Sequence, residues 1–210
     1  MNISSTLLFT LVLGSVFTLS CSLVAAKPAK ILFLGDSLSE GYGINKKYSY
    51  PLVVQSSLKK QGVEIEVLNG SVSGSTTASC ASRLRWFAKA SPDFVFIALG
   101  GNDGLRGIPV SESKKNLRKC TKLAQEKGMT AFLTGMMVPP NYGPDYSKEF
   151  KEMYTSIAKD LKVDLMPFLL VDVAGEKTLN QEDGIHPNKA GHKVMGENVA
   201  KFLAKNFKKK

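Results

Sequence analysis

The chain has 210 residues, which is enough for one sizeable α/β domain and too few for two ordinary ones. Its content of 43% hydrophobic and 22% charged residues is that of a soluble globular protein. The net charge is +10, yet no aromatic-basic stripe or nucleic-acid motif accompanies it, so we exclude nucleic acid as a partner. The lysine-rich C-terminus, Lys205 to Lys210, favours at most a weak contact with an anionic membrane surface.

The N-terminal segment carries no charge and contains a long apolar stretch. Small residues ending at Ala26 offer a cleavage site before Lys27, as in a signal peptide, although no Lys or Arg opens the segment. We predict a signal peptide over residues 1–26 and a single folded domain over residues 27–210. Export to the periplasm or to the medium follows from this prediction.

Two other interpretations of this segment stay open. It is nearly long enough to span a bilayer, so it is compatible with an uncleaved membrane anchor. Cys21 is a candidate for lipid attachment, although Thr18 stands where a lipoprotein signal normally has Leu. All three interpretations imply export, and cleavage after Ala26 is the one we prefer.

The remaining cysteines are Cys80 and Cys120. Export permits a disulfide between them, but two cysteines do not demonstrate one. The chain has only two histidines, His186 and His192, and no Cys-x-x-Cys pair, which argues against metal binding.

Hydrophobic periodicity and turn residues predict five strands, separated by helices. The strands are expected at 29–34, 63–68, 94–99, 129–137 and 163–166, and the helices at 48–61, 77–90, 111–127, 147–161 and 187–206. Loops are expected at 69–75, 100–107, 138–146 and 168–184, the last with room for one helical turn. This alternation predicts a doubly wound, flavodoxin-like, parallel five-stranded sheet with helices on both faces.

Two strands have distinctive patterns. The segment 63–68 alternates apolar residues with glutamates, which indicates one wetter face and an edge position. The segment 94–99 is the most hydrophobic strand and is therefore expected at the centre.

The first motif follows the first strand, where Gly35 and Asp36 precede Ser37. Gly35 can adopt a backbone conformation that other residues resist, so the chain can turn sharply here. A serine at the carboxyl end of a parallel strand lies where open α/β sheets bind ligands, which suits a nucleophile. On its own the pattern is more often that of a serine that caps a helix, and the other motifs change this weighting.

The second motif joins Asp183 to His186, just before Pro187. At this spacing on one turn the carboxylate can reach the imidazole Nδ1, which leaves Nε2 to act as a base. His192 lies among charged residues of the last helix, so we interpret it as an ordinary helical residue.

Two further loops supply candidate hydrogen-bond donors. Asn102 follows the central strand, where its amide can donate to an oxyanion. Gly74 follows the second strand and can present a bare backbone N–H to a ligand. Neither loop has the pattern of a phosphate-binding loop, and the nucleophile elbow Gly-x-Ser-x-Gly is not formed because Val72 occupies its serine position.

In order and spacing, these four motifs resemble those of the SGNH (GDSL-type) hydrolases, over nearly the whole chain after Ala26. The match is closer to the bacterial multifunctional esterases of that family, because Leu99 to Gly107 and Pro140 to Gly143 also agree with them. The resemblance implies a monomeric hydrolase of acyl esters and thioesters, of the arylesterase, thioesterase and lysophospholipase type, that needs no cofactor.

The resemblance also implies the role of each site residue. Ser37 would be the nucleophile, His186 the general base and Asp183 its orienting partner. The backbone N–H groups of Ser37 and Gly74 and the side chain of Asn102 would form the oxyanion hole. A carbohydrate O-deacetylase on the same scaffold and a non-catalytic binding module are the alternatives.

The substrate type is inferred from two loops that leave the same edge of the sheet. The apolar residues that could cover an acyl chain are Leu105, Ile108, Pro109, Val110, Val138, Pro139, Pro140 and Tyr142. The alternative is that they pack beneath the loops as a satellite of the core.

Overall fold

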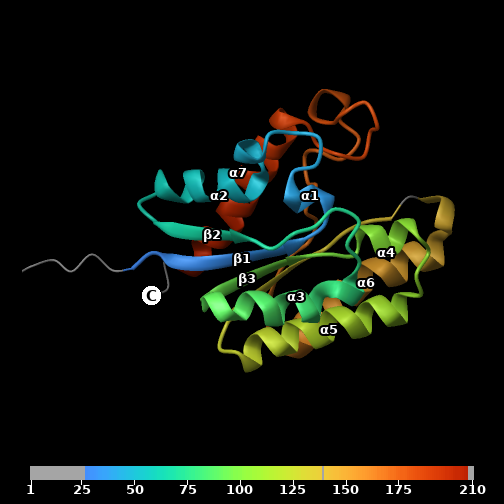
Figure 1. Ribbon diagram of the computed structural model, residues 1–210. Coiled ribbons are helices and arrows are strands. Elements are labelled where there is room, and N and C mark those ends of the chain that lie inside the picture. The colour runs from blue at the N-terminus through green and yellow to red at the C-terminus, as the bar shows by residue number, and fades with distance from the viewer. Residues whose placement is uncertain (1–26, 139, 208–210) are drawn as a thin grey trace, which may run out of the picture.

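The computed structural model describes residues 27–138 and 140–207 (Figure 1). The predicted signal peptide, Pro139 and residues 208–210 lie outside this part of the chain. Its parallel strands form one sheet in the order β2-β1-β3-β4-β5. The strands are β1 (Ala29–Gly35), β2 (Ile65–Asn69), β3 (Phe94–Ala98), β4 (Thr130–Thr134) and β5 (Asp164–Met166). The predicted doubly wound, flavodoxin-like fold is therefore confirmed.

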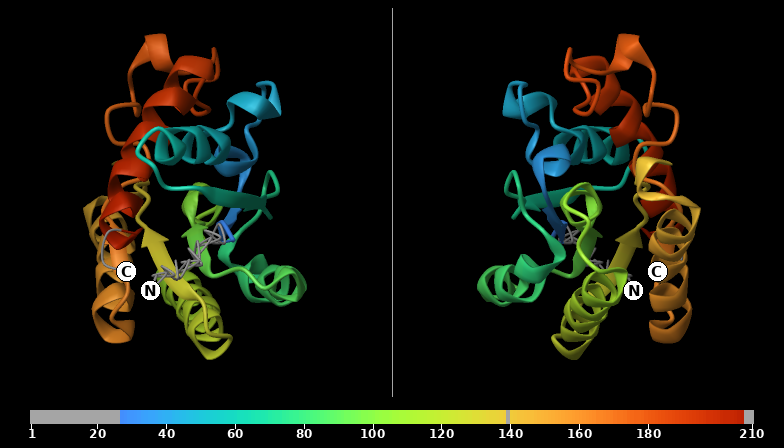
Figure 2. Two further views of the ribbon diagram at one scale, coloured as in Figure 1. Left: turned by 90° about the vertical axis from the view of Figure 1, so that its left-hand side faces the viewer. Right: turned by 90° about the vertical axis from the view of Figure 1, so that its right-hand side faces the viewer.

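Helices cover both faces of the sheet, as Figures 1 and 2 show. One face carries α2 (Tyr50–Lys59) and α7 (Lys189–Phe207), and the other carries α3 (Cys80–Phe87), α5 (Val110–Glu126) and α6 (Pro144–Leu161). Two short helices, α1 (Ser37–Glu40) and α4 (Gly101–Leu105), follow β1 and β3 at the carboxyl edge. Within residues 27–138 and 140–207, no helix has the length and apolar character that a membrane span requires.

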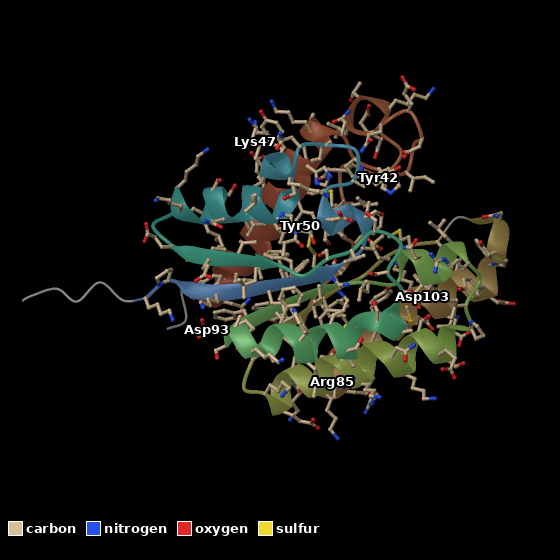
Figure 3. All side chains as sticks on the ribbon, in the orientation of Figure 1. Tyr42, Lys47, Tyr50, Arg85, Asp93 and Asp103 are labelled. Carbon is tan, nitrogen blue, oxygen red and sulfur yellow. A yellow bond between two sulfur atoms is a disulfide. The ribbon has the colours of Figure 1, made fainter. Side chains whose placement is uncertain are left out.

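The core is built on β1 and β3, as their apolar runs predict. Residues Ile31–Leu34 of β1 are completely buried, and every residue of β3 is at most 3% exposed. Phe33 and Phe96 lie side by side on these strands with ring centroids 5.5 Å apart, and Tyr50 of α2 packs edge-on against Phe33 (Figure 3). The predicted edge position of β2 is also confirmed, since β2 pairs only with β1 in the described sheet.

The strand predicted over 129–137 is too long, because β4 ends at Thr134. Its partner β5 has only three residues, so the pairing between the two strands ends at Thr134 and Met166. Met136 and Met137 therefore leave the sheet at its carboxyl edge. This early ending places two flexible apolar side chains beside the loops that follow β1 and β3.

The loop predicted over 100–107 is wrong in part, because residues Gly101–Leu105 form α4. Two of the five residues of α4 are glycines, Gly101 and Gly104, which gives the segment little intrinsic helix propensity. The helix is stabilised instead by the buried side chain of Asp103, which accepts hydrogen bonds from Thr77 N–H (2.9 Å), Thr77 Oγ1 (2.5 Å) and Ser113 Oγ (3.1 Å). Tertiary contacts therefore determine a helix that local preference does not predict.

The other boundaries shift by a few residues. The helix predicted over 147–161 begins earlier, because Pro144 occupies the first turn of α6, where its missing N–H costs nothing. The predicted helical turn in the loop 168–184 is confirmed. Short 3-10 helices flank several elements: η1 (Lys46–Tyr48), η2 (Thr77–Ser79), η3 (Ala88–Ala90), η4 (Pro140–Tyr142) and η5 (Lys177–Leu179).

Cys80 and Cys120 are joined by a disulfide. It links the start of α3 to α5, and both cysteines are fully buried. The two elements that it joins are adjacent to the segments that hold Asp103, namely η2 and the first turns of α5. The bond therefore reinforces the framework on which α4 rests.

We expect the double variant Cys80→Ala/Cys120→Ala to lose about 3–4 kcal/mol in free energy of unfolding, because the cross-link restricts a long loop of the unfolded chain. Urea unfolding followed by circular dichroism measures this change. As a control, dithiothreitol should lower the stability of the wild type in the same way and leave the double variant unchanged. A wild-type unfolding curve that does not respond to the reductant would contradict the prediction.

Candidate active site

Ser37 is the first residue of α1 and lies beside the switch point of the sheet, between β1 and β3. The side chain of Asp36 caps this turn by accepting the Leu38 N–H at 3.1 Å. The expected reason for Gly35 needs correction, because its φ does not lie in the left-handed region. A Cβ at Gly35 would lie 2.1 Å from Ser39 Oγ, so close approach of a side chain requires the glycine.

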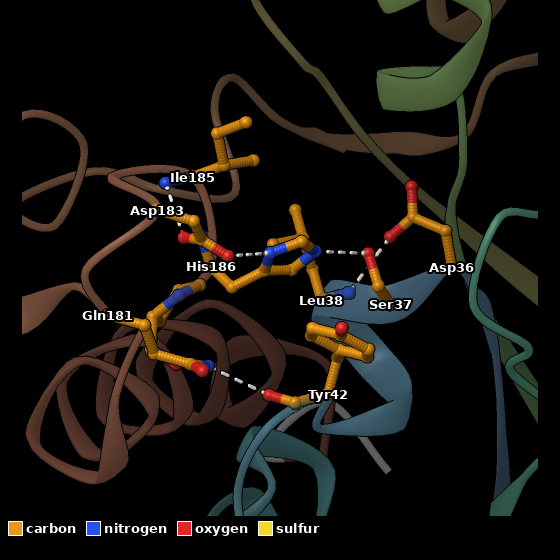
Figure 4. A network of polar contacts seen from close by, with 9 residues as sticks. Asp36, Ser37, Leu38, Tyr42, Gln181, Asp183, Ile185 and His186 are labelled. Carbon is orange, nitrogen blue, oxygen red and sulfur yellow. Dashed lines mark hydrogen bonds and ion pairs between the residues drawn. The ribbon is translucent and has the colours of Figure 1, made fainter.

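The structure brings Ser37, His186 and Asp183 into one hydrogen-bonded chain (Figure 4). His186 Nε2 lies 2.9 Å from Ser37 Oγ, and His186 Nδ1 lies 2.7 Å from Asp183 Oδ2. Asp183 Oδ1 also accepts the backbone N–H groups of Ile185 and His186, each at 2.9 Å. These bonds from His186 and Ile185 lower the pKa of Asp183 to about 2, so the carboxylate is ionised at neutral pH.

The two other candidate donors lie on neighbouring segments. Asn102 Nδ2 donates to the Ser75 carbonyl at 3.1 Å and lies 3.4 Å from Asp36 Oδ2. Gly74 has a φ of +77°, and its carbonyl accepts a hydrogen bond from Arg106 at 3.1 Å. The loop that contains Gly74 is thus held by two side chains of the α4 region, and it lies next to the segment that carries Ser37.

Asp36 is a buried acid beside this site, with 3% of its surface exposed. Burial raises the pKa of Asp36 to about 6, although the hydrogen bond from Leu38 N–H opposes the shift. The sequence analysis identified the residue only as part of the turn. Its buried position beside Asn102 depends on the strand order, which brings the ends of β1 and β3 together.

A cavity of about 250 Å³ opens beside Ser37, Asn102 and His186. Its apolar wall consists of Leu38, Leu105, Met136, Met137, Leu170, Ala174 and Ile185. Leu105, Met137 and Ile185 are each about half exposed, so the mouth of the cavity is apolar as well. A cavity of this kind suits the hydrocarbon part of a ligand whose polar group reaches Ser37.

Among the described side chains of the predicted acyl-covering set, Leu105 lines this cavity, and the prediction is wrong for Ile108, Pro109, Val110, Val138 and Tyr142. Pro139 and the side chain of Pro140 lie outside the described part of the chain. Val110 is 4% exposed and belongs to the core, and Tyr142 turns its hydroxyl to the Leu105 carbonyl. The wall is formed instead by residues that follow β4 and β5. Met136 and Met137 could have been found from the sequence, because they are the last two residues of the strand predicted over 129–137, at the same edge as Ser37.

The chain matches the model of the GDSL-like Lipase/Acylhydrolase family over residues 33–194. It is 38% identical to the arylesterase of Vibrio mimicus over 192 residues, which cover 91% of this chain and 95% of that protein. It is 33% identical to thioesterase 1/protease 1/lysophospholipase L1 of Escherichia coli K12 over 180 residues, 85% of each chain. The crystal structure of the esterase EstA from Pseudoalteromonas sp., inhibited by monoethylphosphonate, superposes with a TM-score of 0.81 at 35% identity, covering 85% of this chain and 98% of that one.

This chain therefore belongs to the GDSL/SGNH family of lipases and acylhydrolases, and it is a carboxylic ester hydrolase. The family match spans all four motifs, from β1 to the start of α7.

His192 is not the ordinary helical residue that the sequence predicts, because it is only 1% exposed. Its Nδ1 accepts the backbone N–H of Tyr50, an otherwise unpaired donor at the start of α2. Burial, with a smaller contribution from repulsion by His186, lowers the pKa of His192 to about 4. The charged residues around it in the sequence lie on the solvent side of α7, and His192 itself faces α2.

The low pKa of His192 predicts a loss of stability in acid. Its folded pKa lies below the unfolded value of 6.5, so its contribution is present above about pH 6.5 and is lost as pH falls toward 4. We expect His192→Asn, whose amide oxygen can replace Nδ1 as acceptor, to lack this part of the pH dependence. Urea unfolding of both proteins between pH 4 and pH 7.5 measures the free energy of unfolding as a function of pH. The same pH dependence in the wild type and in His192→Asn would contradict the prediction.

Proposed function

We propose that the chain is a serine hydrolase of acyl esters and thioesters, with Ser37 as nucleophile, His186 as general base and Asp183 as its orienting partner. The observation that carries the proposal is the continuous chain Asp183–His186–Ser37 at 2.7 and 2.9 Å, which ends at an apolar cavity. The names of the arylesterase and thioesterase relatives support the same reaction.

In the first half of the reaction, Ser37 Oγ attacks the carbonyl carbon of the ester while its proton passes to His186 Nε2. The ionised Asp183 holds Nδ1–H and stabilises the imidazolium that forms. Collapse of the tetrahedral intermediate breaks the bond to the alcohol or thiol, which takes the proton from His186. Water activated by His186 then hydrolyses the acyl-enzyme by the reverse sequence of proton transfers.

The oxyanion is held, in this proposal, by the backbone N–H groups of Ser37 and Gly74 and by Asn102 Nδ2. Each such donor is typically worth about 2.7–4 kcal/mol of the barrier. The contact of Asn102 with Asp36 Oδ2 is long at 3.4 Å, so this N–H can turn to a substrate oxygen while the bond to Ser75 is kept. The reaction requires no cofactor at any of these steps.

We further propose that the protein is exported and that the acyl chain occupies the cavity beside Met136 and Met137. The uncharged residues 1–26 support export, and so does the buried disulfide, because such bonds persist in oxidising compartments. The apolar wall supports an acyl chain longer than acetate.

The nucleophile and base are tested by substitution. We expect Ser37→Ala to abolish ester hydrolysis and labelling by a fluorophosphonate, and His186→Ala to lower kcat by at least about 10³-fold, as loss of a triad member does. The matched control is His192→Asn, which should retain most of the wild-type kcat at pH 7.5. Labelling that persists in Ser37→Ala would refute the proposed nucleophile, and collapse of kcat in the control alone would move the base to His192.

The acyl site is tested by chain length. Each methylene buried from water contributes about 0.8 kcal/mol, or about fourfold, so kcat/KM for p-nitrophenyl esters should rise from two-carbon to medium chains and then level off. Met137→Ser should reduce this rise with little effect on the acetate ester, since the side chain lines the cavity.

The control for this series is Trp86→Ala, since Trp86 is 68% exposed on α3 and does not line the cavity. Its chain-length profile should match the wild type. A wild-type profile that peaks at acetate and collapses with longer chains would reject the lipid-type substrate and favour a carbohydrate O-deacetylase.

A further inference from the structure

Two turns from opposite ends of the chain must meet for Ser37 and His186 to share a hydrogen bond. The first, residues 37–44, contains α1 and the turn after it. The second, residues 180–187, is closed on itself by a bridge between Asn180 and Pro187 and by the bond from Gln181 N–H to the His186 carbonyl, at 2.8 Å. The second turn is therefore a compact unit, whose attachment to the first decides where the imidazole lies.

We infer that Gln181 is a positioning residue that latches this unit onto the turn after Ser37. Its Nε2 donates to the Tyr42 carbonyl at 2.8 Å and to the Pro187 carbonyl at 3.0 Å (Figure 4). Both hydrogens of one amide are thus used, one on each turn. In the described part of the chain, only this bond and Ser37–His186 join the two turns through hydrogen bonds. The inference rests on the function proposed above.

Tyr42 adds a second contact between the same two turns. Its ring lies over the imidazole of His186, with centroids 4.7 Å apart and planes tilted by 43°. The side chain is 51% exposed, so packing in the core does not hold it in place. Its position follows from the backbone, which Gln181 holds at the Tyr42 carbonyl. Gln181 therefore fixes the distance between His186 and Ser37, and it also fixes the Tyr42 ring over the imidazole.

Gly43 makes room for this latch. Its φ is +73°, a conformation that favours glycine, and a Cβ there would lie 2.0 Å from Gln181 Oε1. The turn after α1 thus approaches the amide closely because it lacks a side chain. Any larger residue at position 43 would have to displace Gln181 or move the turn.

The latch matters because the Ser37–His186 bond is consumed during catalysis. The proton leaves Ser37 in one half-reaction and returns in the other, so this bond alone cannot hold the two turns in register. The Gln181–Tyr42 bond takes no part in the chemistry and remains throughout. Misplacement of a catalytic group by about 1 Å can cost on the order of 10²-fold in rate.

The test compares Gln181→Ala and Gln181→Glu with the wild type. Glutamate has the size of glutamine, but its ionised carboxylate cannot donate to two carbonyls. We expect both variants to lose about 10–100-fold in kcat and in the rate of inactivation by a fluorophosphonate, with KM within about twofold and little change in melting temperature. A role in stability alone would lower the melting temperature without this split between kcat and KM.

Gln125 provides the matched control, because its Nε2 also donates to a backbone carbonyl, that of Leu161 at 2.8 Å, far from the site on α5. Gln125→Ala and Gln125→Glu should keep the wild-type kcat. Gly43→Ala should reproduce the loss seen in Gln181→Ala, and the double variant should lose no more than the larger single loss.

The outcomes separate the latch from the function on which it rests. Ser37→Ala is included in every assay, and hydrolysis that survives in it would overturn the proposed function. If Ser37→Ala is inactive while Gln181→Ala and Gln181→Glu keep the wild-type kcat, the latch is overturned alone. If Gln181→Ala does not fold, Gln181→Glu and Gly43→Ala decide the question by the same measurements.

Discussion

The hydrogen bond between Ser37 and His186 joins residues 149 positions apart, and the rest of the architecture can be understood from what it requires. Ser37 follows a strand whose residues Ile31–Leu34 are completely buried, whereas His186 lies in an irregular stretch between β5 and α7. A second chain of hydrogen bonds, inside the core, connects α1, which carries Ser37, to α7, which follows His186. Ser39 of α1 is hydrogen-bonded to the Tyr50 hydroxyl at 2.7 Å, and the Tyr50 N–H donates to His192 of α7. These residues are buried, so α7 is fixed relative to α1 from inside the molecule.

The side of the site formed by α4 depends on the buried side chain of Asp103. Asp103 joins α4 to η2 and α5, and the buried disulfide lies next to both partners. A buried polar group is tolerated only where hydrogen bonds satisfy it, and Asp103 accepts three. Asn102, the neighbour of Asp103, thereby gains a fixed position next to the loop that contains Gly74. In the proposed mechanism this side of the site holds the oxyanion, which requires donors that do not have to reorganise.

The sheet could be predicted from the sequence because its signal is local. Apolar runs of β1 and β3 and the alternation in β2 fix strand type and position, and the regular spacing fixes the parallel order. The motifs around Ser37, Asn102 and His186 could be predicted to meet, since the carboxyl ends of parallel strands share one edge. The helix α4 could not, because glycine-rich sequence opposes it and the bonds of Asp103 to distant residues impose it. The cavity wall was assigned largely to other loops for a related reason, since the length of β4 depends on its pairing with the short strand β5.

The two histidines show why residue type alone does not settle a role. His186 has a carboxylate on one ring nitrogen and a hydroxyl on the other, and its side chain is 20% exposed. His192 has a backbone N–H on Nδ1 and is buried, which lowers its pKa and keeps it neutral at neutral pH. In the proposed mechanism, a second cation so close to the site would oppose the imidazolium formed on His186. The buried, neutral His192 therefore accepts the first N–H of α2 without adding a positive charge near His186.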